Sequence, residues 1–185
     1  MISGRSFADR CKWVVDPRYP DRPTFQHGSA RHGDWVFVNG DYLGAYLRLF
    51  PAISTKSFVV IVHNSDRPFG KVELDAMLPR SIHIYAINTT VEHPQLTTIP
   101  LGFVDRQLHL IQGFSCKSTD RPIEVYMNFA VGTNAPKRAE CMDAVRDNRR
   151  VVRAENVSPL QYYMDLCKSR FVLCPEGTGI DTHRV

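Results

Sequence analysis

The chain has 185 residues, of which 43% are hydrophobic and 23% charged, and its formal net charge is +4. This balance excludes a disordered, collagen-like or coiled-coil protein, and no run of the sequence approaches the 18 apolar residues of a membrane-spanning helix. The basic residues from Lys137 to Arg153 are interspersed with Glu140, Asp143 and Asp147, which is typical of a solvated helix face. A nucleic-acid interface would show an unbalanced basic stripe, so we expect no nucleic-acid partner.

The cysteines and the N-terminus bear on the cellular compartment. The five cysteines form no Cys-x-x-Cys pair and are odd in number, which disfavours a zinc ribbon and a small disulfide scaffold. Cys167 and Cys174 flank a predicted strand, where we expect them to pack in the core. The N-terminal segment MISGRSFADRCKW lacks the apolar region of a secretion signal. These features predict a cytoplasmic protein in a reducing compartment.

Strands and helices alternate along the first part of the chain. A helix that follows the first predicted strand carries Leu43, Tyr46, Leu47 and Phe50 on one face. The continuous apolar run from Phe58 to Val62 is typical of a strand buried on both faces. In chain order, the predicted elements are a strand at 35–38, a helix at 41–50, a strand at 58–62, a helix at 71–78, a strand at 82–87 and a short strand at 97–99.

A second block begins near Arg121. It contains a predicted strand at 123–129, a helix at 136–148, a helix that starts at 159 and a strand that starts at Phe171. Ser158 is a predicted N-cap because Pro159 takes the first helical position and Gln161 stands three residues after the cap. The apolar face of that helix is predicted to contain Leu160, Tyr163, Met164 and Cys167.

The repeated strand-then-helix units predict an α/β fold with parallel sheets and helices on both faces. We expect a Rossmann-like lobe at 1–120 and the start of a second lobe at 121–185. Parallel domains usually need on the order of 100 residues to cover both faces of the sheet, so the second lobe is expected to be incomplete.

Polar residues follow the predicted strands of the first lobe. His63, Asn64 and Asp66 come directly after the apolar strand, and Asn88 follows the next one. Ligands of open α/β sheets bind at the carboxyl ends of strands, so this edge is a candidate active site, with His63 or Asp66 as general base. The alternative interpretation is a capped turn ahead of Pro68.

The second lobe offers two polar segments after its strands. Asn128 and Arg138 supply an amide and a cation that suit a diphosphate, although an exposed arginine on a helix is the alternative. In the closing segment SRFVLCPEGTGIDTHRV, Glu176 suits sugar or ribose hydroxyls, and Gly177 and Gly179 permit a positive φ and close approach of a ligand. The polar residues that follow the glycines are Asp181, Thr182, His183 and Arg184. We expect the chain to end inside this site.

The sequence contains no Asp-x-Asp motif and no His, Cys or carboxylate grouping with metal-ligand spacing. It therefore predicts no metal and no cofactor.

Several segments together resemble exostosin-like glycosyltransferases. YYMDLCKSRFVLCPEGTGIDTHRV is similar to the donor-site segment of that family, and VYMNFAVGTNAPKR is similar to the start of its C-terminal lobe. VVIVHNSD and NTTVEHPQLTTIPLGF resemble segments of its N-terminal lobe. The similarity as a whole spans about residues 35–185. The resemblance implies a GT-B architecture of two Rossmann-like lobes, with the acceptor on the first, the nucleotide sugar on the second and no catalytic metal.

The resemblance also implies roles for donor-side residues. Arg184 and Arg138 would neutralise the leaving diphosphate, and Glu176 and Asp181 would contact hydroxyls of the donor. The implied donor is a UDP-linked sugar, with xylose as one candidate. The helix that follows Arg184 in the family is missing from this chain, which puts its activity in question.

On the acceptor side, His63 or Asp66 would deprotonate the hydroxyl of a glycan acceptor, beside Asn64 and Asn88. Two alternatives to a glycosyltransferase are open. One is a non-catalytic carbohydrate- or nucleotide-binding module, and the other is a hydrolase that uses His63 and Asp66.

Overall fold

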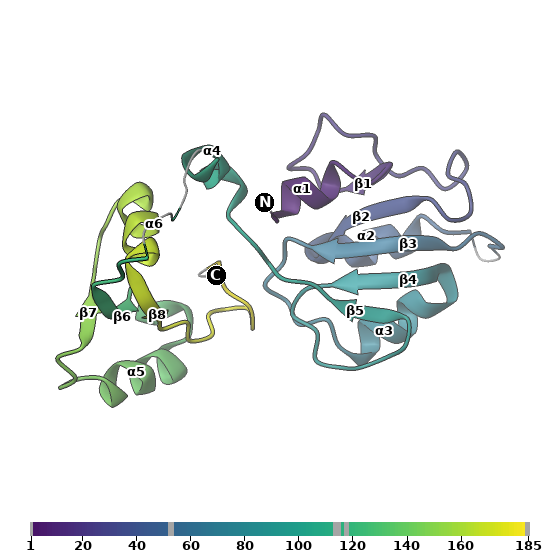
Figure 1. The fold of residues 1–185 in the computed structure, drawn as a ribbon. Coiled ribbons are helices and arrows are strands. Elements are labelled where there is room, and N and C mark those ends of the chain that lie inside the picture. Colours follow the sequence, from purple (N-terminus) through teal and green to yellow (C-terminus); the bar gives the residue numbers. More distant parts are fainter. Residues whose placement is uncertain (1, 52–53, 113–115, 117–118, 184–185) are drawn as a thin grey trace. The chain divides into compact units, whose positions relative to one another are not determined.

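The computed structural model describes residues 2–51, 54–112, 116 and 119–183 (Figure 1). It divides into two compact units. The first comprises Met1–Gly102 together with Gly179–Asp181, and the second comprises Phe103–Thr178 together with the residues that follow Asp181. Both units are α/β, and each contains a parallel sheet.

The first unit contains a five-stranded sheet of order β1-β2-β3-β4-β5, in which all neighbouring strands are parallel. From β2 to β3 and from β3 to β4, each connection leads to the neighbouring strand on the same side of the sheet. Because such crossovers are right-handed, their helices α2 and α3 lie on the same face. The elements of this unit are α1 (Gly4–Ala8), β1 (Trp13–Val15), β2 (Trp35–Asn39), η1 (Gly40–Tyr42), α2 (Leu43–Arg48), β3 (Phe58–His63), α3 (Lys71–Met77), η2 (Leu78–Arg80), β4 (Ser81–Ala86) and β5 (Leu96–Thr98).

Hydrophobic side chains cover both faces of this sheet. On one face, Tyr46 of α2 and Met77 of α3 pack in one cluster with Val60 of β3. On the other face, Phe37 of β2 and Ile61 of β3 pack with residues of α1 and of the segment after β1. The predicted apolar face of the helix at 41–50 is confirmed, because Leu43, Tyr46 and Phe50 are buried and Leu47 packs against them. Because both faces of the sheet are covered, its carboxyl edge is left for the polar residues.

The second unit contains a three-stranded parallel sheet of order β7-β6-β8. Tyr126 and Met127 are consecutive residues of β6, so their side chains point to opposite faces. Tyr126 lies against Tyr162 of α6, whereas Met127 lines a pocket with Met142 of α5, and the two helices therefore cover opposite faces. The elements are η3 (Asp105–Gln107), α4 (Leu108–Ile111), β6 (Ile123–Met127), η4 (Val131–Thr133), α5 (Ala135–Ala144), β7 (Val151–Arg153), α6 (Pro159–Cys167) and β8 (Ser169–Val172).

The start of α6 is confirmed as predicted. The Ser158 hydroxyl accepts a hydrogen bond from the backbone N–H of Gln161, and Pro159 occupies the first helical position. The predicted apolar face is only partly correct, because Tyr163 is buried but Leu160 is 44% exposed.

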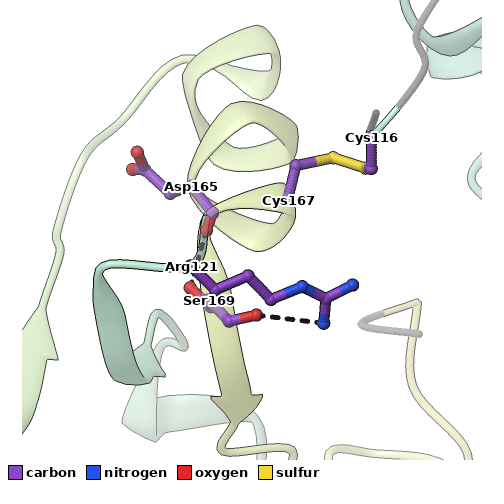
Figure 2. Close-up of a disulfide and its surroundings, with 5 residues drawn as sticks. All are labelled: Cys116, Arg121, Asp165, Cys167 and Ser169. Atoms are coloured by element: carbon purple, nitrogen blue, oxygen red, sulfur yellow. Dashed lines mark hydrogen bonds between the residues drawn. A yellow bond between two sulfur atoms is a disulfide. The ribbon is translucent and has the colours of Figure 1, made fainter. Parts of the chain in front are cut away.

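A disulfide joins Cys116 to Cys167 at the end of α6 (Figure 2). The Cα atoms are 5.3 Å apart, within the usual range for a disulfide. The expectation that Cys167 packs as a core thiol is therefore wrong, and so is the same expectation for Cys174, which is exposed. The bridge closes a loop across 51 positions and ties the segment ahead of β6 to α6.

Candidate functional site

Polar side chains gather at the carboxyl edge of the first sheet. His63, the last residue of β3, is 1% exposed. Its Nδ1 atom lies 2.9 Å from Oδ1 of Asn64, and its Nε2 atom lies 3.3 Å from the carbonyl oxygen of Pro100. Both oxygens only accept, so each contact is a hydrogen bond when the ring nitrogen that makes it carries a proton. In this arrangement the ring is held by protein groups and does not face solvent.

Asn64 connects His63 to a buried carboxylate. Its Nδ2 amide donates to Oδ2 of Asp16 at 3.1 Å and to the Tyr19 hydroxyl at 2.8 Å. Burial by itself would raise the pKa of Asp16, but hydrogen bonds from Arg18 and Asn64 and the charge of Arg18 lower it below its ordinary value. The network therefore holds an ionised carboxylate beneath the sheet edge.

Asn88 and the segment Gly179–Asp181 form a second part of the same unit. The Asn88 side chain is buried, donates to the carbonyl oxygen of Ser65 and accepts from the backbone N–H of Asp181 at 2.9 Å. A Cβ atom on Gly179 would lie 2.9 Å from Asn88 Nδ2, so this position favours glycine by close approach. Asp181 in turn accepts a 2.6 Å bond from the N–H of Leu101. Asn88 and Asp181 thus hold the chain in place at the ends of β4 and β5.

Asp66 differs from these residues because it is exposed, directly after the buried Ser65. Beside it, a pocket of about 230 Å³ lies between α2 and α3. Ser65 donates from its hydroxyl to Asp41, and the Arg67 guanidinium lies 3.6 Å from the same carboxylate. The edge thus exposes the carboxylates of Asp41 and Asp66 and the guanidinium of Arg67, above the buried Ser65 hydroxyl.

In the second unit, the strand order contains a topological switch point. The chain passes from β6 to β7 on one side and then crosses back to β8 on the other side. The crevice outside the carboxyl ends of the strands at such a point is the usual ligand site of open α/β sheets. The loops that follow β6 and β8 border this crevice.

Arg138 of α5 joins these two loops. Its side chain is buried, with 3% exposure. Its Nη1 donates to the carbonyl oxygen of Ala130 at 2.5 Å, and its Nε donates to that of Glu176 at 2.8 Å. A Cβ atom on Gly177 would lie 2.8 Å from Nη2, so Gly177 leaves the space that the guanidinium occupies.

Two neighbours of Arg138 hold the same loop. Asn134 Nδ2 donates to the carbonyl oxygen of Gly177 at 3.2 Å, and Lys137 forms an ion pair with the Glu176 carboxylate. The sequence interpretation missed these two residues. The sequence did contain an indication of them. A helix predicted to start at Pro136 places residues 134–138 at its N-terminal end, close to the end of the preceding strand.

The remaining donor-side candidates have other surroundings. The Asn128 amide donates to the carbonyl oxygen of Ala154 at 3.0 Å, in the wall of a pocket in the same unit. His183 is exposed, and Arg184 lies outside the described residues. Gly177 and Gly179 do not adopt the positive φ that glycine permits, since the glycines with positive φ in the described chain are Gly33 and Gly102.

No model of a known protein family matches the chain, and no curated protein sequence matches it either. Within the described ranges, no group of three or more His, Cys, Asp or Glu side chains is placed to hold a metal ion. No helix in the described part of the chain is both long and apolar enough to cross a membrane. The geometry of the two sheet edges is therefore the basis for any statement on function.

Proposed function

We propose that the chain is a GT-B-type glycosyltransferase of the exostosin-like kind. In this proposal, the second unit binds a nucleotide sugar and the first binds a glycan acceptor. The donor is UDP-linked, with xylose as a candidate sugar, and the transfer needs no metal.

One observation carries the proposal: the switch point of the sheet β7-β6-β8 is bordered by two loops that Arg138 joins. Parallel α/β sheets bind nucleotides at such points, and the N-terminus of a helix there favours a diphosphate. Here α5 begins at this edge, and its first turn carries Lys137, whose side chain is 57% exposed and forms an ion pair with Glu176. These groups would stabilise the departing nucleoside diphosphate as the bond to the sugar breaks.

The acceptor hydroxyl needs a group that takes its proton. Asp66 is exposed at the carboxyl edge of the first sheet, whereas His63 is enclosed by Asn64 and Pro100. A general base must come within hydrogen-bond reach of the acceptor, so exposure favours Asp66 over His63. The pocket that includes Ser65 and Arg67 supplies hydroxyl and guanidinium groups near that edge, which suit a glycan.

The test measures ligand-induced thermal stabilisation of this chain with UDP-, GDP- and TDP-sugars, followed by transfer assays with radiolabelled donor. A ligand that binds the folded state raises the melting temperature by mass action. We expect one nucleotide class to raise it by several degrees and Lys137→Met to reduce that shift. Lys71→Met, an exposed lysine on α3 of the other unit, is the matched control and should leave the shift unchanged.

Three results decide between the possible functions. Stabilisation with sugar transfer to a glycan supports the proposal, and loss of transfer in Asp66→Asn supports the assigned base. Stabilisation without transfer to any acceptor indicates a binding module, and release of free sugar indicates a hydrolase. If no nucleotide stabilises the chain, the proposal is wrong.

A further inference from the structure

A pocket of about 440 Å³ lies at the carboxyl ends of β6 and β7, within the second unit. It shares the segment after β6 with the crevice between the β6 and β8 loops, but its other walls come from the segment after β7 and from α5. Its lining includes Phe129, Val131, Met142 and Val157 as apolar groups. Its polar side chains include Asn128 and Glu155.

The polar side chains of this pocket differ in their hydrogen bonds and in their exposure to solvent. The Arg153 guanidinium donates to the carbonyl oxygens of Val145 and Arg146 at the end of α5, so it caps that helix. The Asn128 amide donates to Ala154 and fixes the wall between the two loops. Glu155 is exposed and stands two residues beyond the end of β7. It therefore offers a carboxylate at the rim of a pocket lined by both apolar and polar groups.

We propose that this pocket receives the nucleoside of a ribonucleotide, with the base between apolar walls and Glu155 accepting hydrogen bonds from ribose hydroxyls. The inference rests on the proposed function, because it places one part of the nucleotide sugar that the second unit would bind. It assigns a residue that the sequence interpretation did not single out.

The topology supports this assignment. In dinucleotide-binding α/β folds, an acidic residue after the second strand, about 20 residues beyond the glycine loop, binds ribose hydroxyls. Here Glu155 follows the second strand of the unit and stands 23 positions after Gly132, in the loop after the first strand. The loop Ala130-Val131-Gly132-Thr133 lacks the Gly-x-Gly-x-x-Gly pattern, so the argument rests on the pocket and the strand order rather than on that motif.

Charge supports the same orientation. A carboxylate repels a phosphate but is a good acceptor for two adjacent hydroxyl groups. The diphosphate would then lie toward the β6 and β8 loops, at the first turn of α5, where the carboxylate of Glu176 is paired with Lys137. The apolar side chains that line the pocket suit a flat base, as in most small-molecule pockets.

The test compares UDP with 2′-deoxy-UDP and 3′-deoxy-UDP by calorimetry, for the unaltered chain and for Glu155→Ala. We expect loss of one ribose hydroxyl to weaken binding to the unaltered chain by about tenfold, since an unpaired polar partner is left behind. Glu155→Ala should bind UDP about tenfold more weakly and no longer distinguish it from the deoxy forms. Glu140→Ala, an exposed carboxylate on α5 outside the pocket, should behave like the unaltered chain.

Methyl resonances of methionine provide a second measurement. Met127 and Met142 line the pocket, whereas Met77 and Met164 do not. With methyl-labelled methionine, UDP should shift the signals of Met127 and Met142 and leave those of Met77 and Met164 in place. The inference is wrong if Glu155→Ala still distinguishes UDP from its deoxy forms, or if UDP shifts neither Met127 nor Met142. In either case, binding of UDP would still support the proposed function. Absence of binding by any nucleotide would overturn both.

Discussion

The Nδ2 amide of Asn64 donates a hydrogen bond to Oδ2 of Asp16 at 3.1 Å, and this bond links the ends of β1 and β3. Asn64 has a φ of 61°, a left-handed conformation that asparagine tolerates better than most residues. Its side-chain amide would lie 2.7 Å or less from a Cβ atom on Gly4, so α1 packs directly over it. The N-terminal helix α1 thus packs against the polar edge of the first sheet.

Replacement of Asp16 by asparagine should destabilise the first unit. The substitution keeps the shape but removes the charge that accepts bonds from Asn64 and Arg18. Since Arg18 is 53% exposed, solvent screens part of that charge interaction, and we expect a loss of about 1–2 kcal/mol in the free energy of unfolding. Urea denaturation at pH 7 measures it.

The effect of Asp16→Asn on the free energy of unfolding should depend on pH. The folded-state pKa of Asp16 is lowered from its ordinary value of 3.8, so the carboxylate stabilises the fold above pH 3.8 and this contribution is lost as the pH falls through the lowered pKa. The stability difference between the two proteins should therefore be constant near neutrality and shrink below pH 3.8. Asp75→Asn, on the exposed surface of α3, is the control. A difference that persists undiminished in acid would contradict the assignment.

Replacement of Tyr46 by phenylalanine should stabilise the first unit. Tyr46 is fully buried, and its hydroxyl has no hydrogen-bond partner among the described residues. Burial also raises the pKa of this hydroxyl. Removal of a buried unpaired group relieves its desolvation cost, and we expect a gain of about 1 kcal/mol in thermal or urea unfolding. A loss of stability would mean that the hydroxyl has a bound water or another partner in solution.

The sequence predicts most of the first sheet because its central strands and helices have strong local patterns. The run from Phe58 to Val62 and the face that contains Tyr46 correspond to β3 and α2. The strand Trp13–Val15 was missed because three residues give no periodicity, and its pairing with β2 is what makes it a strand. Val151–Arg153 was missed for the same reason, at the end of a charged stretch.

The candidate site is harder to predict because its contacts are remote in the chain. Arg138 was expected either at a diphosphate or on an exposed helix face, whereas it is buried against the carbonyl oxygens of Ala130 and Glu176. Nothing near position 138 indicates a partner 38 positions away. Glu155 likewise becomes a candidate only when β7 is known to end two residues before it.

Loss of the disulfide should destabilise the second unit. The bond constrains a loop spanning 51 positions, for which the chain-entropy estimate is about 4 kcal/mol, and measured effects are often smaller. We expect Cys116→Ser with Cys167→Ser, or treatment with a dithiol reductant, to lower the unfolding free energy of this unit by about 2–4 kcal/mol. Cys174→Ser, which replaces an exposed thiol outside the disulfide, should have a smaller effect. Equal stability of oxidised and reduced protein would show that the pairing does not form in solution.

Arg138→Met should release the loop that follows β8. The variant keeps an unbranched apolar stem but removes the guanidinium donors to Ala130 and Glu176. The Ala130 carbonyl oxygen keeps only the 3.3 Å bond from the Thr133 hydroxyl. We expect a loss on the order of 2–4 kcal/mol in stability and at least tenfold faster amide hydrogen exchange at 173–178. Exchange in β3 of the first unit provides an internal reference.

Two further variants separate the loop contact from general unfolding. Gly177→Ala leaves Arg138 in place but puts a methyl group 2.8 Å from Nη2, so it should also accelerate exchange at 173–178. Lys137→Met changes the neighbouring residue, which pairs with Glu176 and has a side chain that is more than half exposed. This variant should lower the free energy of unfolding by less than about 1 kcal/mol. If Arg138→Met and Gly177→Ala both leave the exchange of this loop unchanged, the guanidinium does not hold it, and the loop is ordered by its own backbone.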